Sequence, residues 1–392
     1  MKRAMHSGFL PGNQIALLET GAEFFPALTA AIAAAQHEIQ LETYIFADDS
    51  TGRRIAAALT SAAQRGVAVR LLVDGFGSRE FVAGCGQTLI AGGVQLLVYR
   101  PDPPSMKLRR YRLRRLHRKL AVVDGRTAFI GGVNIVDDYN EGETDQPRLD
   151  YALRIEGPLV TRIHAAMRHV WRLVRWSTLG RRPPQPPPPP LPAPPCGPIA
   201  AALLIRDNLR HRRDIENAYL AAIGQAQYEI VVANAYFLPG MRLRHALRAA
   251  ARRGVSVVLL LQGRVEHVLQ HYATQALYAS LLASGIRIYE YRASYLHAKV
   301  AVIDHRWATV GSSNIDPFSL LLAREANVVI RNTRFSLKLR RRLLHAIATG
   351  ATEIRLDDLQ RQSWLVTLAG KLAYGIVRLL LDVSGYSRHY AE

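Results

Sequence analysis

The chain repeats itself, and this repeat limits the folds open to it more than any other feature. The segment AAAQHEIQLETYIF (residues 33–46) returns as AIGQAQYEIVVANAYF (222–237). Likewise, RGVAVRLLVDG (65–75) returns as RGVSVVLLLQG (253–263). In each copy, strand-like apolar runs alternate with Ala-rich segments of helical period, such as residues 55–63. A repeat of this length predicts an α/β fold of two similar halves, related by a pseudo-twofold axis.

Length and a Pro-rich stretch divide the chain further. At 392 residues it is too long for one ordinary core, so we expect about two domains. The stretch RRPPQPPPPPLPAPPCGP lies between the two copies, and consecutive prolines fix φ and lack N–H donors. It is typical of an extended connector. The sequence therefore predicts an N-terminal half over 1–180, a linker over 181–198, a C-terminal half over 199–360 and a C-terminal segment over 361–392.

The two halves also share a pair of polar residues at the start of an apolar strand. LHRKLAVVDG carries His117 and Lys119, and LHAKVAVIDH carries His297 and Lys299. Side chains at i and i+2 of a strand lie on one face, so each His shares a face with its Lys. One such pair is typical of a surface strand, but two matched pairs favour chemistry. A neutral imidazole can attack a phosphodiester, an ammonium group stabilises charge on the phosphoryl oxygens, and a second His can protonate the leaving oxygen.

Each motif continues through a tight turn into a second strand that ends in small residues and an Asn. Asp124 and Asp304 lie at the turns, and Asn134 and Asn314 end the segments GGVN and GSSN. Asp before Gly is typical of a tight turn, so a structural role is favoured for the two Asp residues. They belong to the repeated motif nevertheless, and we keep them among the candidate catalytic residues.

The pattern His-x-Lys-x4-Asp-x6-Gly-(Gly/Ser)-x-x-Asn, present twice, resembles the signature of the phospholipase D superfamily. Within it, the segments LETYIF, FIGGVNI, ANAYFLP, VGSSNIDPFSL and EANVVI are most similar to the bacterial cardiolipin synthases of the B type, although related lipases and nucleases share much of them. The resemblance implies a mixed sheet flanked by helices in each half, and one active site between the halves. It also implies a covalent phosphohistidine intermediate, with no metal and no other cofactor.

The resemblance also implies roles for single residues. The family's motif residues fall on His117, Lys119, Asp124, Asn134, His297, Lys299, Asp304 and Asn314. In such enzymes an acidic residue on a later strand orients each His. Glu325 fits that place in the second half, and Asp150 is the aligned candidate in the first, with Asp145 as a neighbouring alternative. Gly132 stands where the family often has Ser, which weakens the case for a hydroxyl contact there.

The basic charge predicts a polyanionic partner. The net charge is +20, and the run KLRRYRLRRLHRK (107–119) has no counterpart in the second half. An anionic phospholipid surface would be attracted to it, and so would nucleic acid. The C-terminal segment SWLVTLAGKLAYGIVRLLLD (363–382) favours lipid, because it predicts a helix with a broad apolar face and a polar stripe. Such a helix either packs on the second half or lies in the membrane interface, and Lys371 and Arg378 argue against a membrane span.

These features predict a peripheral enzyme on the cytoplasmic side of a bacterial cell membrane. There are only two cysteines without metal-ligand spacing, and no long apolar run at the start, so we expect neither disulfides nor a signal peptide. The hypothesis is a cardiolipin synthase that joins two phosphatidylglycerol molecules and releases glycerol, with His117 as nucleophile and His297 as acid and then base. Phosphatidylethanolamine stays open as the second lipid. The alternatives are a phospholipase D or nuclease that uses water, and a non-catalytic nucleic-acid-binding protein, which the two intact His-Lys pairs disfavour. Nucleic acid is thus disfavoured as a partner, and no protein partner is predicted.

Overall fold

The computed structural model describes residues 8–101, 114–139, 145–179, 193–207, 210–361 and 364–383. The strands of the first half are β1 (Leu10–Glu19), β2 (Glu38–Thr43), β3 (Ala68–Asp74), β4 (Gln95–Tyr99), β5 (Leu120–Val123), β6 (Thr127–Gly131) and β7 (Tyr151–Glu156). Those of the second half are β8 (Ile199–Arg206), β9 (Glu229–Asn234), β10 (Ser256–Gln262), β11 (Arg287–Tyr291), β12 (Lys299–Ile303), β13 (Trp307–Gly311), β14 (Glu325–Arg331) and β15 (Ala351–Ile354).

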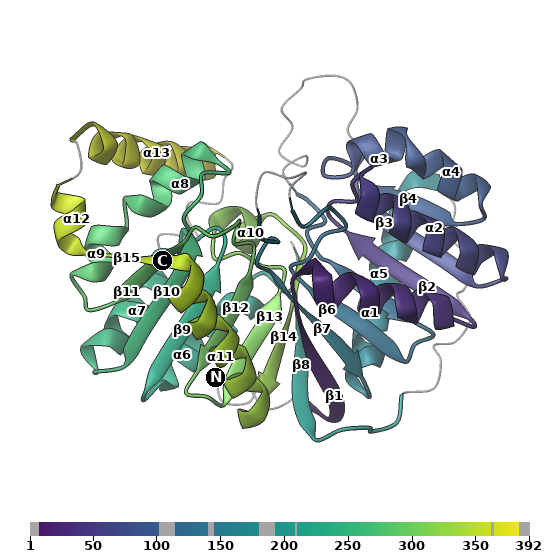
Figure 1. Cartoon of the computed structure of the whole chain (residues 1–392), viewed down its shortest axis with the longest axis horizontal. Helices are drawn as coiled ribbons and strands as arrows, with labels where there is room; N and C mark the ends of the chain where they lie inside the picture. The colour runs from purple at the N-terminus through teal and green to yellow at the C-terminus, as the bar shows by residue number, and fades with distance from the viewer. Residues whose placement is uncertain are drawn as a thin grey trace.

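All of these strands form one sheet, in the order β15-β11-β10-β9-β12-β13-β14-β8-β1-β7-β6-β5-β2-β3-β4. Counted outward from the central pair β8 and β1, the two halves place corresponding strands at corresponding positions, and β15 is added at one edge. In each half the hairpin strands pair antiparallel, whereas β2-β3-β4 and β9-β10-β11 are parallel. This arrangement, visible in Figure 1, confirms the predicted α/β fold of two similar halves with mixed sheets.

Helices cover both faces of the sheet. Those of the first half are α1 (Thr20–Ala34), α2 (Ser50–Gln64), α3 (Arg79–Ala83), α4 (Cys85–Ala91) and α5 (Leu159–Leu179). Those of the second half are α6 (Asp214–Gln225), α7 (Met241–Arg252), α8 (Val268–Gln275), α9 (Tyr278–Leu282), α10 (Pro317–Leu321), α11 (Thr333–Gly350), α12 (Leu356–Gln360) and α13 (Trp364–Val383). α1, α2 and α4 bury their apolar side chains with β2 and β3 on one face, and α6, α7 and α9 do the same with β9 and β10. α5 and α11 pack on the opposite face.

The repeated Arg-Gly step has the same structural task in both halves. Gly66 and Gly254 adopt left-handed φ values of +90° and +86°, at the ends of α2 and α7. A glycine reaches this conformation without steric cost, which lets the chain leave the helix and enter a parallel strand. The preceding Arg65 donates to the carbonyl oxygens of Ile32 and Ala33 at the end of α1. Arg253 makes the equivalent bonds at the end of α6.

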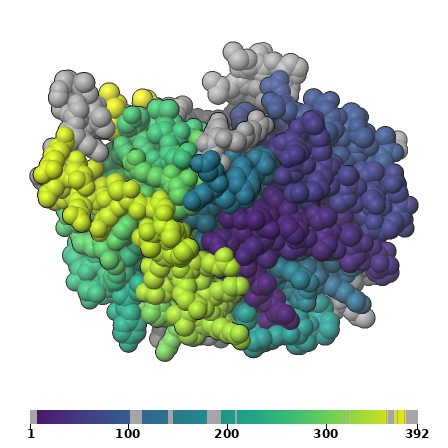
Figure 2. Space-filling view, viewed as in Figure 1, coloured from purple at the N-terminus to yellow at the C-terminus, as the bar shows by residue number. Residues whose placement is uncertain are grey.

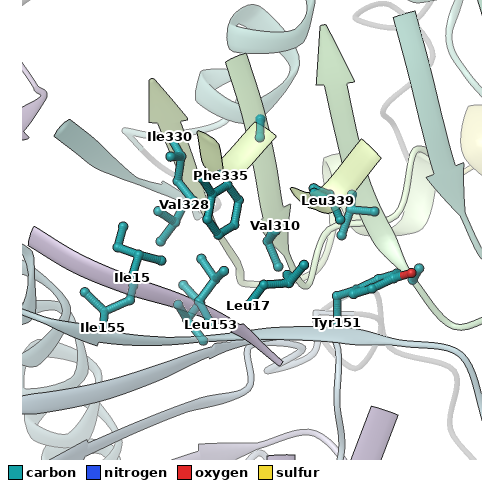
Figure 3. Packing of buried hydrophobic residues seen from close by; sticks show 14 of the residues in the cluster. Ile15, Leu17, Tyr151, Leu153, Ile155, Val310, Val328, Ile330, Phe335 and Leu339 are labelled. Carbon is teal, nitrogen blue, oxygen red and sulfur yellow. The ribbon is translucent and has the colours of Figure 1, made fainter. Parts of the chain in front are cut away.

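The two halves share one apolar core at the centre of the molecule. Figure 3 shows side chains of β1 and β7 facing those of β13, β14 and α11; the labelled ones are Ile15, Leu17, Tyr151, Leu153, Ile155, Val310, Val328, Ile330, Phe335 and Leu339. Arg342 of α11 extends the contact at the surface, with ion pairs to Glu19 and Glu23. Accordingly, the purple and the yellow-green surfaces meet along a continuous seam in Figure 2. The shared core fixes the position of one half relative to the other.

The C-terminal part of the chain forms α13, close to the predicted helix. Ala373 and Val377 are buried in the core of the second half, and Gly370 lies against Tyr272 of α8. No helix in the described ranges is both long enough and apolar enough to span a bilayer. The linker expected over 181–198 lies largely outside the described residues, and the boundaries given for the halves stay predictions.

Candidate active site

The backbone brings the two His-Lys motifs together between the halves. Each motif runs into β5 or β12, which pairs antiparallel with β2 or β9, so both His residues lie at the end of the sheet where β2 and β9 finish. The His117 N–H donates to the carbonyl of Arg324 at 3.0 Å, and the His297 N–H donates to that of Leu149 at 2.8 Å. Arg324 and Leu149 belong to the half opposite to the His that each of them binds. Each motif is therefore fixed by the segment that precedes an acidic residue of the other half.

The imidazoles contact the acids in the same crossed manner. Nδ1 of His117 lies 2.9 Å from Oε1 of Glu325, and Nδ1 of His297 lies 2.6 Å from Oδ2 of Asp150. When the carboxylate of a pair is ionised it only accepts hydrogen bonds, and the imidazole then has its proton on Nδ1 and a lone pair on Nε2. Of the two candidates in the first half, Asp150 rather than Asp145 contacts a histidine.

Burial controls the charge of the imidazoles. The pKa of His117 is lowered, chiefly by burial, and that of His297 is lowered well below its usual value by burial and by the charges of Lys299 and Arg148. Burial also raises the pKa of Asp150 to about 7. Both imidazoles are therefore neutral in the free protein at neutral pH. Neutrality is what a nucleophilic histidine requires.

The two lysines add positive charge to the same buried place. Lys119 Nζ donates to the carbonyl of His117 at 2.7 Å, and Lys299 Nζ donates to that of His297. Desolvation is the main reason that the pKa of Lys119 falls to about 7 and that of Lys299 to about 8. Each ammonium also lies close enough to Glu325 and Asp150 for their charges to raise its pKa. The two lysines are therefore cations only below about pH 7 to 8, and in that form, beside two neutral imidazoles, they suit a phosphodiester monoanion.

The two motifs differ in the small residue that follows their first glycine, which is Gly132 in the first half and Ser312 in the second. In the second half, Ser312 Oγ donates to Oε2 of Glu325 at 2.5 Å. In the first half, a Cβ at Gly132 would lie only 2.2 Å from Oδ1 of Asp150. The space of the missing hydroxyl is thus taken by the carboxylate that contacts His297.

The motif asparagines lie at the same site in different environments. Oδ1 of Asn134 accepts the N–H of Ile45 at 3.2 Å and so holds the loop that follows β2. Asn314 is buried, and its Oδ1 has no hydrogen-bond partner among the described residues. In the second half, Asn234 of β9 instead accepts the N–H of Ile315 at 3.0 Å.

Asp124 and Asp304, which were kept among the candidate catalytic residues, make backbone contacts of the structural kind that their turn position favours. Asp124 accepts three backbone N–H groups of residues 36–38, at 2.9, 2.8 and 2.9 Å. Asp304 does the same for residues 227–229, at 2.8, 2.8 and 3.0 Å. Both have a left-handed backbone, with φ of 51° and 48°, and both lie at the far end of the hairpin strand from the histidine. Their carboxylates fasten a turn and do not join the cluster.

Three residues of the site were missed from the sequence. The ring of Tyr44 lies 4.9 Å from that of His117, and Lys119 Nζ lies 5.3 Å from the same tyrosine ring. Asp74 and Gln262 accept the N–H of the residue before each motif histidine, at 2.8 and 3.1 Å. Both end the repeated strand, in LLVDG and LLLQG, so the repeat carried a signal for this pair. Tyr44 has no such signal, because the aligned residue in the second half is Ala235.

The last residues of the basic run make contacts within the protein. Residues 107–113 lie outside the described residues. Arg115 lies 3.8 Å from Asp74 and 4.8 Å from the ring of Phe76. Arg118 is buried and donates to Oε2 of Glu42 at 2.5 and 3.0 Å. Arg118 therefore supports the site from within and is not available to a lipid surface.

The described part of the chain contains no cluster of His, Cys, Asp or Glu that could hold a metal ion.

Comparison with known proteins decides the family. The family model described as "Cardiolipin synthase, PLD-like domain" matches residues 28–171 and 219–347, one match for each His-Lys motif. The chain is 40% identical to cardiolipin synthase B of Salmonella typhi over 95% of its length and 90% of that protein. It is 39% identical to cardiolipin synthase B of Escherichia coli over the same shares. The chain belongs to the cardiolipin synthase family of the phospholipase D superfamily. It is a cardiolipin synthase-like enzyme.

A solved structure shows that the fold of this cardiolipin synthase relative is shared more widely. The phosphatidylserine synthase of Haemophilus influenzae superposes with a TM-score of 0.71 over 98% of this chain and 99% of that one. Their sequences are only 16% identical, so this likeness concerns the fold alone.

Proposed function

We propose that this enzyme transfers a phosphatidyl group from one phosphatidylglycerol to another, which yields cardiolipin and free glycerol. The observation that supports it most is the pair of neutral imidazoles, each held through Nδ1 by an acid of the other half. This leaves two Nε2 atoms and two ammonium groups for one phosphodiester. The names of the relatives, cardiolipin synthase B, suggest the same product.

The steps follow from this arrangement. Nε2 of His117 attacks phosphorus, the bond to the headgroup oxygen breaks, and that oxygen takes a proton from His297, which the bound anion helps to protonate. The hydroxyl of a second phosphatidylglycerol then gives its proton to His297. Its oxygen attacks phosphorus and displaces His117. Lys119 and Lys299 stabilise the phosphoryl oxygens in both steps. Glu325 supports the nucleophile, because its carboxylate stabilises the charge that the imidazole gains.

The test is the reaction itself with purified protein and phosphatidylglycerol vesicles. We expect cardiolipin and glycerol in equal amounts, also with EDTA present, because His and Lys supply the chemistry. His117→Ala and His297→Ala should each lower the rate by at least about 10³-fold. His245→Ala, which changes an exposed histidine of α7, is the matched control. Phosphatidic acid as sole product would mean that water resolves the intermediate, and the transfer proposal would be wrong. Addition of phosphatidylethanolamine tests the second lipid.

We also propose that α13 attaches the enzyme to the anionic lipid surface from the cytoplasmic side. One side of this helix packs on α8, whereas an exposed stripe is formed by Leu368, Leu372, Ile376 and Leu379, between 43% and 61% exposed. Four apolar side chains at helical spacing, exposed on one side, suit insertion among acyl chains. α13 and α8 lie at the same end of the sheet as the catalytic cluster (Figure 1). Both cysteines are free, which fits a reducing compartment.

This attachment is tested by co-sedimentation with vesicles. Replacement of the four stripe residues by Ser should lower binding to anionic and to neutral vesicles, because burial of apolar area is lost. Leu337→Ser, at an exposed leucine of α11, should bind like the native protein. Salt at 1 M, where the Debye length is about 3 Å, should release the native protein only partly. If the stripe variant sediments like the native protein, the helix serves packing alone.

A further inference from the structure

An open polar pocket adjoins His297 in the second half. It is open to solvent, which contributes to its empty space of about 310 Å³, and it lies between the loops after β9 and β10 and the helix α8. Two of its lining residues flank the histidine directly: Gln262 accepts the N–H of Leu296, and the Ala235 N–H donates to the carbonyl of Ala298. Two lining residues of the pocket are thus bonded to the chain neighbours of His297.

Some polar groups of the pocket wall already have partners within the protein. Tyr236 donates to Oε2 of Glu266 at 2.7 Å, and Arg148 lies 3.3 Å from Oε1 of the same residue. Glu266 also acts on Lys299, whose pKa its charge raises. The Glu266 carboxylate therefore has a donor and a cationic neighbour within the pocket wall.

Two other polar groups of the pocket are left open. Gln262 is only 8% exposed, and its Nε2 has no hydrogen-bond partner among the described residues. Oε1 of Gln270, on α8, is likewise buried without a partner there. A buried amide group without a partner costs about 1–3 kcal/mol, so such groups are commonly completed by a ligand or a water. One is a donor and the other an acceptor. A hydroxyl group can satisfy both.

In the first half, the residue at the position of Gln262 has hydrogen-bond partners for its polar side-chain atoms. Gln262 corresponds to Asp74, whose Oδ2 accepts the N–H of Leu116 and whose Oδ1 accepts the N–H groups of Phe76 and Gly77. Arg115 also contacts Oδ1. The two halves therefore differ at this position, and the open groups lie on the side of His297.

We infer that this pocket is the alcohol subsite, which binds the glycerol headgroup through its hydroxyls, with Gln262 as donor and Gln270 as acceptor. The inference rests on the proposed function. In the first step the leaving oxygen takes its proton from His297, and in the second the incoming hydroxyl returns a proton to it. Both alcohols therefore occupy the same side of the phosphorus, opposite to His117. A pocket beside His297 fits both, and one subsite then selects the released and the incoming headgroup.

The experiment offers two alcohols to the same intermediate. The donor is phosphatidyl-p-nitrophenol in mixed micelles, whose leaving group needs no proton and whose release reports the first step by colour. Glycerol and 1-propanol, which share a three-carbon chain, are added together, and the ratio of the two phosphatidyl products is measured by mass spectrometry. The ratio is read within one reaction, so a change in total turnover does not enter it.

We expect the native enzyme to prefer glycerol, and Gln270→Met to reduce this preference roughly tenfold, as for the loss of one buried hydrogen bond. Gln262→Glu, which keeps the acceptor for Leu296 but removes the donor, should reduce it similarly and serves as the second variant. Gln87→Met, at an exposed glutamine of α4, is the matched control and should leave the ratio unchanged. An unchanged ratio in both pocket variants, or a native enzyme without preference, would overturn the subsite while transfer itself stands. A native enzyme that makes neither alcohol product would instead refute the proposed function.

Discussion

At the scale of single residues, the proposed chemistry depends on the ammonium groups of two buried lysines. Lys119 and Lys299 were predicted as site residues from the sequence, because two matched His-x-Lys pairs are not expected of ordinary surface strands. Asp150 and Glu325 were found through the resemblance. The crossing of the pairs was not predicted. It follows from the contact of His117 with Arg324 and of His297 with Leu149, between segments far apart in the chain, which no local pattern encodes.

The pH dependence of the reaction tests this electrostatic arrangement. The pKa of Lys119 and of Lys299 is lowered to about 7 and about 8, so their charge is lost far below the usual pKa of 10.5. We expect kcat/KM, which reports the free enzyme, to fall as the pH rises through 7 to 8. Its acid limb should lie below 6.5, because the nucleophile His117 must be neutral and its pKa is lowered by burial. Rates with phosphatidylglycerol from pH 5 to 10, with vesicle binding measured at each pH, check this. A constant kcat/KM up to pH 10 would contradict it.

At the scale of elements, the tight turn after each His-Lys strand was predicted correctly. The backbone N–H groups to which the Asp of each turn is bonded were not predicted. The Asp-Gly step of the first half, and the equivalent turn of the second, indicate a hairpin from residue type alone. The acceptance of three N–H groups from the start of β2 or β9 depends on tertiary pairing and leaves no trace in the local sequence. For α13, the sequence pattern predicted a helix with a broad apolar face. Which apolar side chains are buried and which are exposed is decided by the packing of this helix on α8, which the pattern does not contain.

These turns provide a stability prediction. Asp124→Ala and Asp304→Ala should each lower the free energy of unfolding by about 0.5–1.5 kcal/mol, because one part-buried and two exposed N–H groups lose their acceptor in each half. We expect kcat to stay within about threefold, since neither carboxylate joins the cluster. Urea unfolding and the transfer assay measure the two effects, with Glu80→Ala, an exposed carboxylate of α3, as control. A loss of activity at unchanged stability would return both residues to the catalytic group.

At the scale of the whole molecule, the repeat predicted two similar halves but not how they join. β1 and β8, which continue the sheet from one half into the other, lie outside the repeated segments that were recognised. The shared core of β1, β7, β13, β14 and α11 likewise depends on side chains from distant parts of the chain (Figure 3). This core holds Glu325 opposite His117 and Asp150 opposite His297. The central claim is therefore one site per chain, not one site per half.

The number and place of covalent intermediates test this claim most directly. The native enzyme is mixed with phosphatidyl-p-nitrophenol, quenched within milliseconds under alkaline conditions that preserve phosphohistidine, digested, and mapped by mass spectrometry. The account predicts a burst of one p-nitrophenolate per chain and one phosphatidyl group, on the peptide that contains His117, with none in His117→Ala. Two groups per chain would show that the halves act independently and would contradict the account. One group per chain, shared equally by the His117 and His297 peptides, would contradict only the choice of His117 as nucleophile.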